Sequence, residues 1–113
     1  MIIEYNPLHN GHLYLVEEAR RILGADTAMI GVMSGDFVQR GHPAIFDKSV
    51  RAKAAILSGA DLVLELPVTA ALSSAERFAS EGVRILSHFC SHLCFGAETA
   101  DADALMDTAS ALL

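Results

Sequence analysis

Four short apolar runs alternate with helix-like segments along this chain, and this alternation is the feature that most limits its fold. The runs cover Ile2–Tyr5, Thr27–Met33, Asp61–Leu66 and His92–Phe95. In the second and third runs the apolar residues are almost continuous, as in strands that are covered on both faces. Strands that alternate with helices through short links form parallel β-α-β units. We therefore predict an α/β fold: a parallel sheet in the order 3-2-1-4 with helices on both faces.

Helix signals fill the segments between these runs. Apolar residues recur at helical spacing, and residues that favour helix ends stand where each pattern starts or stops. Ser73, with Glu76 three residues later, has the form of a capping box. The predicted helices cover Leu13–Leu23 with Gly24 as C-cap, a segment from Asp47 to Ser58, a segment from Ser73 to about Ser87, and a segment from Asp101 through Leu112.

Composition indicates one compact domain over residues 1–113. The chain has 113 residues, a length at which a compact domain buries roughly two-thirds of its unfolded surface. Hydrophobic residues make up 52% of the chain, which argues against disorder. No apolar run approaches the length of a membrane span, and the start lacks the basic-then-apolar form of a signal peptide. With only two cysteines, we expect a cytoplasmic protein without a membrane partner.

The charge of the chain is negative overall but basic in one stretch. A net charge of −6 argues against a general nucleic-acid binder, because affinity for phosphates needs Lys and Arg. Four of the eight basic residues lie between Arg40 and Lys53. Arg40 follows the second run in a long loop, where a guanidinium suits a phosphate or a carboxylate. Lys48 and Arg51 are further candidates for phosphate or substrate contacts, and the alternative is that both lie solvated on an exposed helical face.

The segment Tyr5–His12 joins the first predicted strand to the first predicted helix. Backbone N–H groups at a helix start lack partners within the helix, and this end attracts anions such as phosphates. Gly11 lets the backbone come close to a ligand, and the imidazoles of His9 and His12 can donate to phosphate oxygens. Fixed donors stabilise charge that builds up during attack at an α-phosphate. The H-x-G-H pattern therefore predicts nucleotide binding and activation, with His9 and His12 as catalytic residues.

The strand order 3-2-1-4 would bring Gly96 opposite these histidines, across a crevice between the first and fourth strands. Gly96 then either permits a turn or lets adenine or ribose lie against the backbone. Glu65, before Pro67, is interpreted as an ordinary strand terminus.

Histidines and cysteines alternate in His88–Cys94, which raises the question of a zinc site. Zinc needs four converging ligands, whereas a segment that passes from a helix into a buried strand points its side chains to different sides. We therefore predict no metal site and interpret Cys90 and Cys94 as small buried apolar residues.

Several motifs follow one another in the order seen in one known family. They are Glu4–His12, Gly31–Gly41, Asp47–Lys48 with Arg51–Ala52, Leu62–Pro67, Ser74–Glu76 and Phe95–Glu98. Through them the chain resembles the N-terminal part of the bacterial tRNA(Met) cytidine acetate ligases, within the H-x-G-H nucleotidyltransferase superfamily. The resemblance covers nearly the whole chain. Leu8 stands where the family usually has Phe, and His42 replaces a position that is commonly acidic or polar.

The resemblance implies the nucleotidyltransferase variant of the Rossmann-like fold. It also implies that ATP, expected with Mg²⁺, reacts with acetate to give acetyl-adenylate and pyrophosphate. The acetyl group would then pass to the wobble cytidine of elongator tRNA(Met), giving N4-acetylcytidine. This chain would be a piece of a longer enzyme that holds the tRNA contacts. The implied ATP-binding residues are Ile3, Glu4, Tyr5, Asn6, Pro7, Leu8, His9, Asn10, Gly11, His12, Leu13, Tyr14 and Gly96.

Two other functions stay open on the sequence. One is a small adenylyltransferase that moves AMP onto a phosphorylated metabolite, and the other is a non-catalytic nucleotide-binding module. Exposed apolar faces on a short sheet also allow two copies of the chain to pair as a homo-oligomer.

Overall fold

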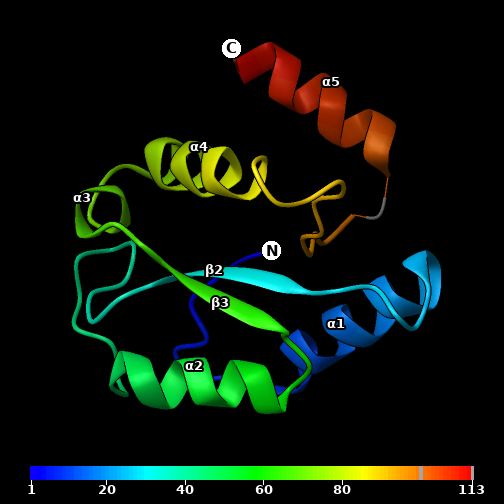
Figure 1. Ribbon diagram of the computed structural model, residues 1–113. Helices are drawn as coiled ribbons and strands as arrows, with labels where there is room; N and C mark the ends of the chain where they lie inside the picture. Colours follow the sequence, from blue (N-terminus) through cyan, green and yellow to red (C-terminus); the bar gives the residue numbers. More distant parts are fainter. Residues whose placement is uncertain (100, 113) are drawn as a thin grey trace.

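A three-stranded parallel sheet lies between helices in this protein (Figure 1). The computed structural model describes residues 1–99 and 101–112. The strands are β1 (Ile2–Ile3), β2 (Ile30–Ser34) and β3 (Leu62–Leu66), in the spatial order β1-β2-β3. The helices are α1 (Asn10–Leu23), α2 (Lys48–Leu57), α3 (Val68–Ala71), α4 (Ala75–Leu86) and α5 (Ala102–Leu112).

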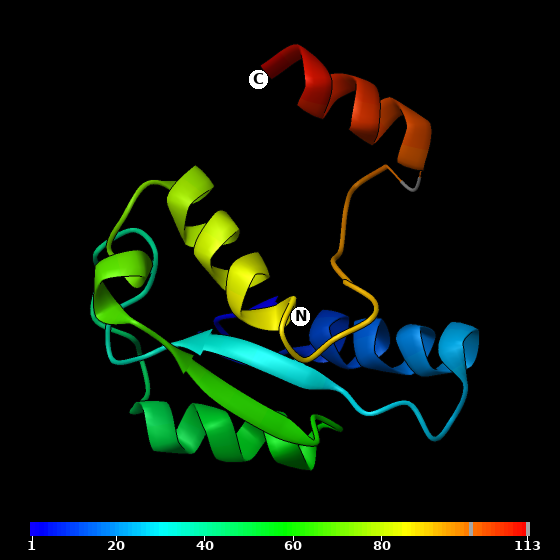
Figure 2. The ribbon, with the colours of Figure 1, turned by 45° about the horizontal axis from the view of Figure 1, so that its top comes forward.

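Helices cover both faces of the sheet, as predicted. Figures 1 and 2 show α1 and α2 on one face and α3 and α4 on the other. Val32 and Met33 are neighbours in β2, yet they belong to two different cores, because successive side chains of a strand point to opposite faces. Val16 of α1 and Ala55 of α2 pack in the core of Met33, whereas Leu86 of α4 packs in the core of Val32. Double coverage explains why the β2 run is almost continuously apolar.

The predicted fourth strand is not formed in the described part of the chain. The residues 92–95 have no strand conformation, so the predicted order 3-2-1-4 holds only for its first three strands. β1 is two residues long, and a neighbour on its free edge would gain few ladder hydrogen bonds. Leu93 and Phe95 stay exposed, and only Cys94 of this run packs against a core. Both views show α5 apart from the sheet, and α5 buries no residue.

Most helix ends follow the predicted capping residues. The fourth helix is an exception, because its N-cap is Ser74 and not Ser73. The Ser74 hydroxyl accepts from the Arg77 N–H at 3.4 Å, while the Ser73 hydroxyl donates to the Ala70 carbonyl at 2.6 Å. The predicted capping box of Ser73 and Glu76 is therefore wrong, because the N-cap lies one residue later and the third helical residue is then Arg77. The caps at Gly24, Asp47 and Asp101 are confirmed.

Helix α1 begins three residues earlier than predicted, because two histidines cap it. The Gly11 N–H donates to Nδ1 of His9 at 3.1 Å, and the His9 N–H donates to Nδ1 of His12 at 3.2 Å. This reciprocal capping box usually pairs Ser or Thr with Glu or Gln. Because each Nδ1 accepts a hydrogen bond, each neutral ring carries its proton on Nε2. Burial, and then the nearby His9, lower the pKa of His12 below its ordinary value of 6.5.

Arg51 of α2 connects the carboxyl ends of two strands from inside the protein. Arg51 is 1% exposed. It donates to the Glu4 carbonyl after β1 at 2.6 Å and to the Ser34 carbonyl in β2 at 3.0 Å. Further donors meet the Gly35 carbonyl and, at 3.1 Å, the Phe46 carbonyl. Arg51 therefore does not lie on an exposed helical face, which was one of its two interpretations. The other, a phosphate contact, does not fit either, because the buried guanidinium donates to backbone carbonyls.

No helix in residues 1–99 or 101–112 has the length and hydrophobicity needed to cross a membrane.

Replacing Arg51 by Met should lower the free energy of unfolding by about 3 kcal/mol or more, because several buried carbonyls lose their donors. Arg51→Lys should lose less, although a single ammonium cannot reproduce the guanidinium fork. Lys53→Met, on the exposed side of the same helix, is the matched control and should change stability by about 0.5 kcal/mol or less. Urea unfolding measures the free energy of unfolding of all three variants. An Arg51→Met variant as stable as Lys53→Met would contradict the stabilising role of Arg51.

Acid should weaken the fold through the α1 cap. The folded pKa of His12 lies below the unfolded value of 6.5, so the unfolded chain binds more protons in the window between the two values. Stability from this group is complete above about pH 6.5 and is lost as the pH falls through the folded pKa. His12→Asn keeps an acceptor at the Nδ1 position but cannot titrate. Urea unfolding from pH 7.5 down to 5 should therefore show a smaller acid loss in His12→Asn than in the wild type or in His92→Asn, and equal losses would refute this account.

Candidate functional site

The predicted histidine pair lies on a cleft of about 470 Å³ between the β1–α1 turn and the tip of the loop that follows β2. Arg40 lies on the loop side of this cleft. The structure therefore brings together Arg40 and the histidine pair, which were separate candidates in the sequence. The cleft is lined by Glu4, Tyr5, Asn6, Pro7, His9 and His12 from the turn and by Val38, Gln39, Arg40 and His42 from the loop.

Stacked rings fix the two imidazoles. The ring centroids of His9 and His12 are 3.7 Å apart, with an interplanar angle of 27°. The ring of Tyr5 lies 4.6 Å from that of His12. Tyr5 is 3% exposed and adopts a left-handed backbone with φ of 46°, which turns the chain away from β1. Burial raises the pKa of the Tyr5 hydroxyl. The buried Tyr5 ring thus provides a fixed wall against which His12 packs.

Gly11 has a structural reason to lack a side chain. A Cβ at this position would lie 3.1 Å from Cε1 and 3.2 Å from Nδ1 of His9. The His9 ring therefore folds back over the Gly11 backbone to accept its N–H. The approach of a ligand to Gly11, predicted from the sequence, remains a prediction.

The two rings can act as neutral donors. Both Nδ1 atoms accept backbone N–H groups, and the lowered pKa of His12 keeps that ring neutral at physiological pH. The remaining N–H of each neutral ring is on Nε2. The start of α1 adds the positively polarised end of a helix beside them. Two donors beside a helix N-terminus form a site for anionic oxygens.

The loop between β2 and α2 is attached to the β1–α1 segment at two points. The Glu4 carboxylate accepts the Gln39 N–H at 2.7 Å, and the Asn6 side-chain carbonyl accepts the Ile45 N–H at 2.7 Å. Within the loop, the Val38 N–H donates to the His42 carbonyl at 3.0 Å. These contacts form a tight tip between the two attachment points, and Arg40 and His42 belong to this tip.

Several predicted site residues lie away from the cleft lining. Ile3 is buried in a core, and Leu8 packs against the same core. Gly96 is exposed, and a Cβ added there would meet no atom within 4 Å. Because the fourth strand is missing, the structure does not place Gly96 opposite the histidines. The remaining residues, Asn10, Gly11, Leu13 and Tyr14, form the first turns of α1.

Lys48 belongs to a different cavity. Its Nζ donates to the two carboxylate oxygens of Glu65 at 2.9 and 3.0 Å and lies 4.0 Å from the Asp36 carboxylate. The hydrogen bond to Glu65, followed by its charge, raises the pKa of Lys48. The cavity beside this ion pair measures about 250 Å³ and includes Ser34 and Gly35. The sequence suggested only an ordinary strand terminus at Glu65, whereas the structure also gives its carboxylate an ion pair with Lys48.

Sequence reasoning missed the structural roles of three residues at the cleft. Glu4 was predicted only as part of an ATP-binding stretch, Gln39 only as part of the Gly31–Gly41 motif, and His42 only as a departure from the family pattern. The one available signal was the length of the loop after β2, since long loops within compact domains are often functional. The residues to which that loop is attached lie 35 and 39 positions away in the sequence, beyond any local pattern.

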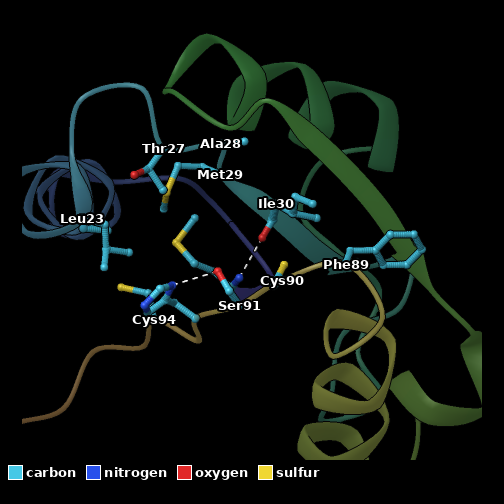
Figure 3. Close-up of a pocket in the computed structure, with 12 residues that line it drawn as sticks. Leu23, Thr27, Ala28, Met29, Ile30, Phe89, Cys90, Ser91 and Cys94 are labelled. Atoms are coloured by element: carbon cyan, nitrogen blue, oxygen red, sulfur yellow. Dashed lines mark hydrogen bonds between the residues drawn. The ribbon is translucent and has the colours of Figure 1, made fainter.

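A third cavity lies between the end of α1 and the segment that follows α4 (Figure 3). Cys90 and Cys94 line it as free, half-buried thiols, each packed beside one of the two cores. They were interpreted as buried apolar residues, and the structure buries each of them only in part. In the described residues, no three His, Cys, Asp or Glu side chains gather as a metal site would require.

Curated relatives of this chain share its sequence closely. The chain is 50% identical over 114 residues to the tRNA(Met) cytidine acetate ligase of Geobacillus sp. (strain WCH70), which covers all of this chain and 28% of that protein. It is 53% identical to the enzyme of the same name from Acetivibrio thermocellus, over 93% of this chain and 26% of the relative. The chain thus spans little more than a quarter of these relatives, and the resemblance inferred from the motifs is confirmed.

Solved structures agree with the sequence matches. The crystal structure of Thermotoga maritima TmcAL bound with alpha-thio ATP superposes with a TM-score of 0.89 at 44% identity, over 98% of this chain and 27% of that chain. The apo form of the same protein gives the same score and identity. The predicted nucleotidyltransferase type of fold is therefore confirmed.

A family model described as HIGH Nucleotidyl Transferase matches residues 1–113. Together with the H-x-G-H histidines at the start of α1, this match over the whole chain shows that the protein belongs to the HIGH nucleotidyl transferase family.

Proposed function

We propose that the histidine cleft binds the triphosphate of ATP and that this chain carries out the acetate-activating step of a tRNA(Met) cytidine acetate ligase. One observation carries the proposal: His9 and His12 use Nδ1 to cap α1, which leaves the Nε2–H groups as fixed neutral donors beside a helix N-terminus. Arg40, on the same cleft, adds a permanent positive charge. The names of the relatives and the ATP analogue in the Thermotoga maritima structure support the choice of nucleotide and reaction.

The chemistry needs charge stabilisation more than proton transfer. A carboxylate oxygen of acetate attacks the α-phosphorus of ATP, and the bond from this phosphorus to the bridging oxygen of the β-phosphate breaks. Acetyl-adenylate and pyrophosphate result, with negative charge developing on the departing oxygen. Donors already aimed at that charge stabilise it without reorganising. We assign this role to the Nε2–H groups of His9 and His12, with Arg40 on the phosphate tail.

The later partners are also part of the proposal. The amine of the wobble cytidine in elongator tRNA(Met) would take the acetyl group, releasing AMP and giving N4-acetylcytidine. With a net charge of −6, this chain offers little for a tRNA backbone, so we assign most tRNA contacts to the remainder of a protein as long as the relatives. A tRNA substrate and free thiols fit the cytoplasm.

Magnesium would accompany ATP in this scheme. Mg²⁺ keeps several waters and commonly binds nucleotide phosphates with only one or two protein carboxylates. Glu4 is the one carboxylate on the cleft lining of the described residues, and it already accepts a backbone N–H. We therefore propose that phosphate oxygens and water hold most of the metal.

Two substitutions of His12 should separate the roles of its two ring nitrogens. His12→Asn keeps an acceptor at the Nδ1 position and loses the Nε2 donor, whereas His12→Gln keeps a donor near Nε2 and loses the cap. We expect His12→Asn to fold stably and to lower acetate-dependent pyrophosphate release by about 10²–10³-fold. His12→Gln should be less stable and about tenfold more active than the Asn variant. The reverse ranking of activities would remove His12 from the chemistry.

Calorimetry with ATP and a pyrophosphate-release assay with acetate together test the function. Binding with acetate-dependent release supports the proposal. AMP transfer to a phosphate ester would identify the small adenylyltransferase instead, and ATP binding without any release would identify a non-catalytic module.

A further inference from the structure

We infer that Glu4 is a positioning residue, which holds the loop tip carrying Arg40 and His42 against the histidine pair. The inference deepens the proposed function of the cleft and rests on it. Glu4 follows β1 directly, and its carboxylate accepts the Gln39 N–H at 2.7 Å and a weaker hydrogen bond from the Ser34 hydroxyl at 3.4 Å. Gln39 immediately precedes Arg40, so this contact fixes the backbone at the residue before the guanidinium.

The base of this contact is rigid. The Glu4 carbonyl accepts from the buried guanidinium of Arg51, which also holds the Ser34 carbonyl. The main chain and the side chain of Glu4 are therefore both held, one by α2 and the other by the loop. A firmly held acceptor can define where the Gln39 N–H lies.

A second anchor limits the loop on the far side of its tip. The Asn6 side-chain carbonyl accepts the Ile45 N–H at 2.7 Å. Between the two anchors, the Gly41 N–H donates to the Val38 carbonyl at 2.8 Å, and Gly41 has φ of 78°, a conformation that suits glycine. The tip is thus a tight turn held at both ends by residues of the β1–α1 segment.

Electrostatics argue against direct contact between the Glu4 carboxylate and a triphosphate. Two negative groups at close range repel, and the repulsion grows as water is excluded. A backbone N–H, in contrast, is a partner that a carboxylate prefers. The carboxylate lies on the cleft lining because the loop crosses it there, and its effect on the ligand passes through Arg40.

The first test needs no nucleotide. In ATP-free protein, amide hydrogen exchange at Gln39 should be about tenfold faster in Glu4→Ala than in the wild type, because the N–H loses its acceptor. Exchange at Ile45, held by Asn6, should change far less and serves as the internal control. Glu4→Gln retains a side-chain oxygen that can accept, so its Gln39 amide should stay close to the wild type.

The second test is a double-mutant cycle on ATP affinity. Glu4→Ala and Arg40→Ala should each weaken ATP binding about tenfold, which is the size expected for one charged hydrogen bond. The double variant should be weakened by about the same factor, not by about 100-fold, because both changes remove one contact. Glu4→Gln should bind within about threefold of the wild type, and this rescue separates positioning through an oxygen acceptor from a need for negative charge.

Three results would overturn the inference. The first is a Glu4→Ala variant that binds ATP like the wild type. The second is a double variant whose loss of ATP affinity equals the product of the two single losses. The third is a Glu4→Gln variant that binds ATP as weakly as Glu4→Ala. Equal acceleration of exchange at Gln39 and Ile45 would equally contradict a local anchor. If the wild-type protein fails to bind ATP, the proposed function fails, and the exchange experiment still decides whether Glu4 holds the loop.

Discussion

Reciprocal capping of α1 by His9 and His12 is the interaction on which the candidate site depends. It commits both Nδ1 atoms to backbone N–H groups, and thereby fixes the orientation of each ring and the nitrogen that carries its proton. Stacking of the rings at 3.7 Å and the buried Tyr5 behind His12 hold this arrangement. One local motif therefore starts the helix and prepares two donors, so stability and function are linked at the same atoms.

Long-range contacts complete the cleft around this motif. The buried guanidinium of Arg51 joins the ends of β1 and β2 through their carbonyls. Glu4, held by that guanidinium, and Asn6 then attach the loop that carries Arg40. A positive side chain on a loop of this length would otherwise sample many positions, at a considerable entropic cost for binding. The cleft thus has a rigid turn on one side and a restrained loop on the other.

The sequence was enough to predict the elements that depend on local patterns. The three strands, the coverage of both faces and the caps at Gly24, Asp47 and Asp101 agree with the structure. His9 and His12 were predicted as ligand donors but not as caps, because cap preferences favour Ser, Thr, Asp and Asn. The run 92–95 has strand-like composition, but a strand also requires a pairing edge, and β1 offers only two residues. The burial of Arg51 depends on carbonyls up to 47 positions away, which no local period reveals.

The tautomers of His9 and His12 test the central claim most directly. Side-chain ¹⁵N NMR at pH 7.5 reports which ring nitrogen carries the proton and whether it changes environment on binding. The account predicts unprotonated Nδ1 and protonated Nε2 in both rings, with ATP shifting the Nε2 signals while the Nδ1 atoms remain acceptors. Protons on Nδ1, or Nε2 signals that do not respond to saturating ATP, would contradict it.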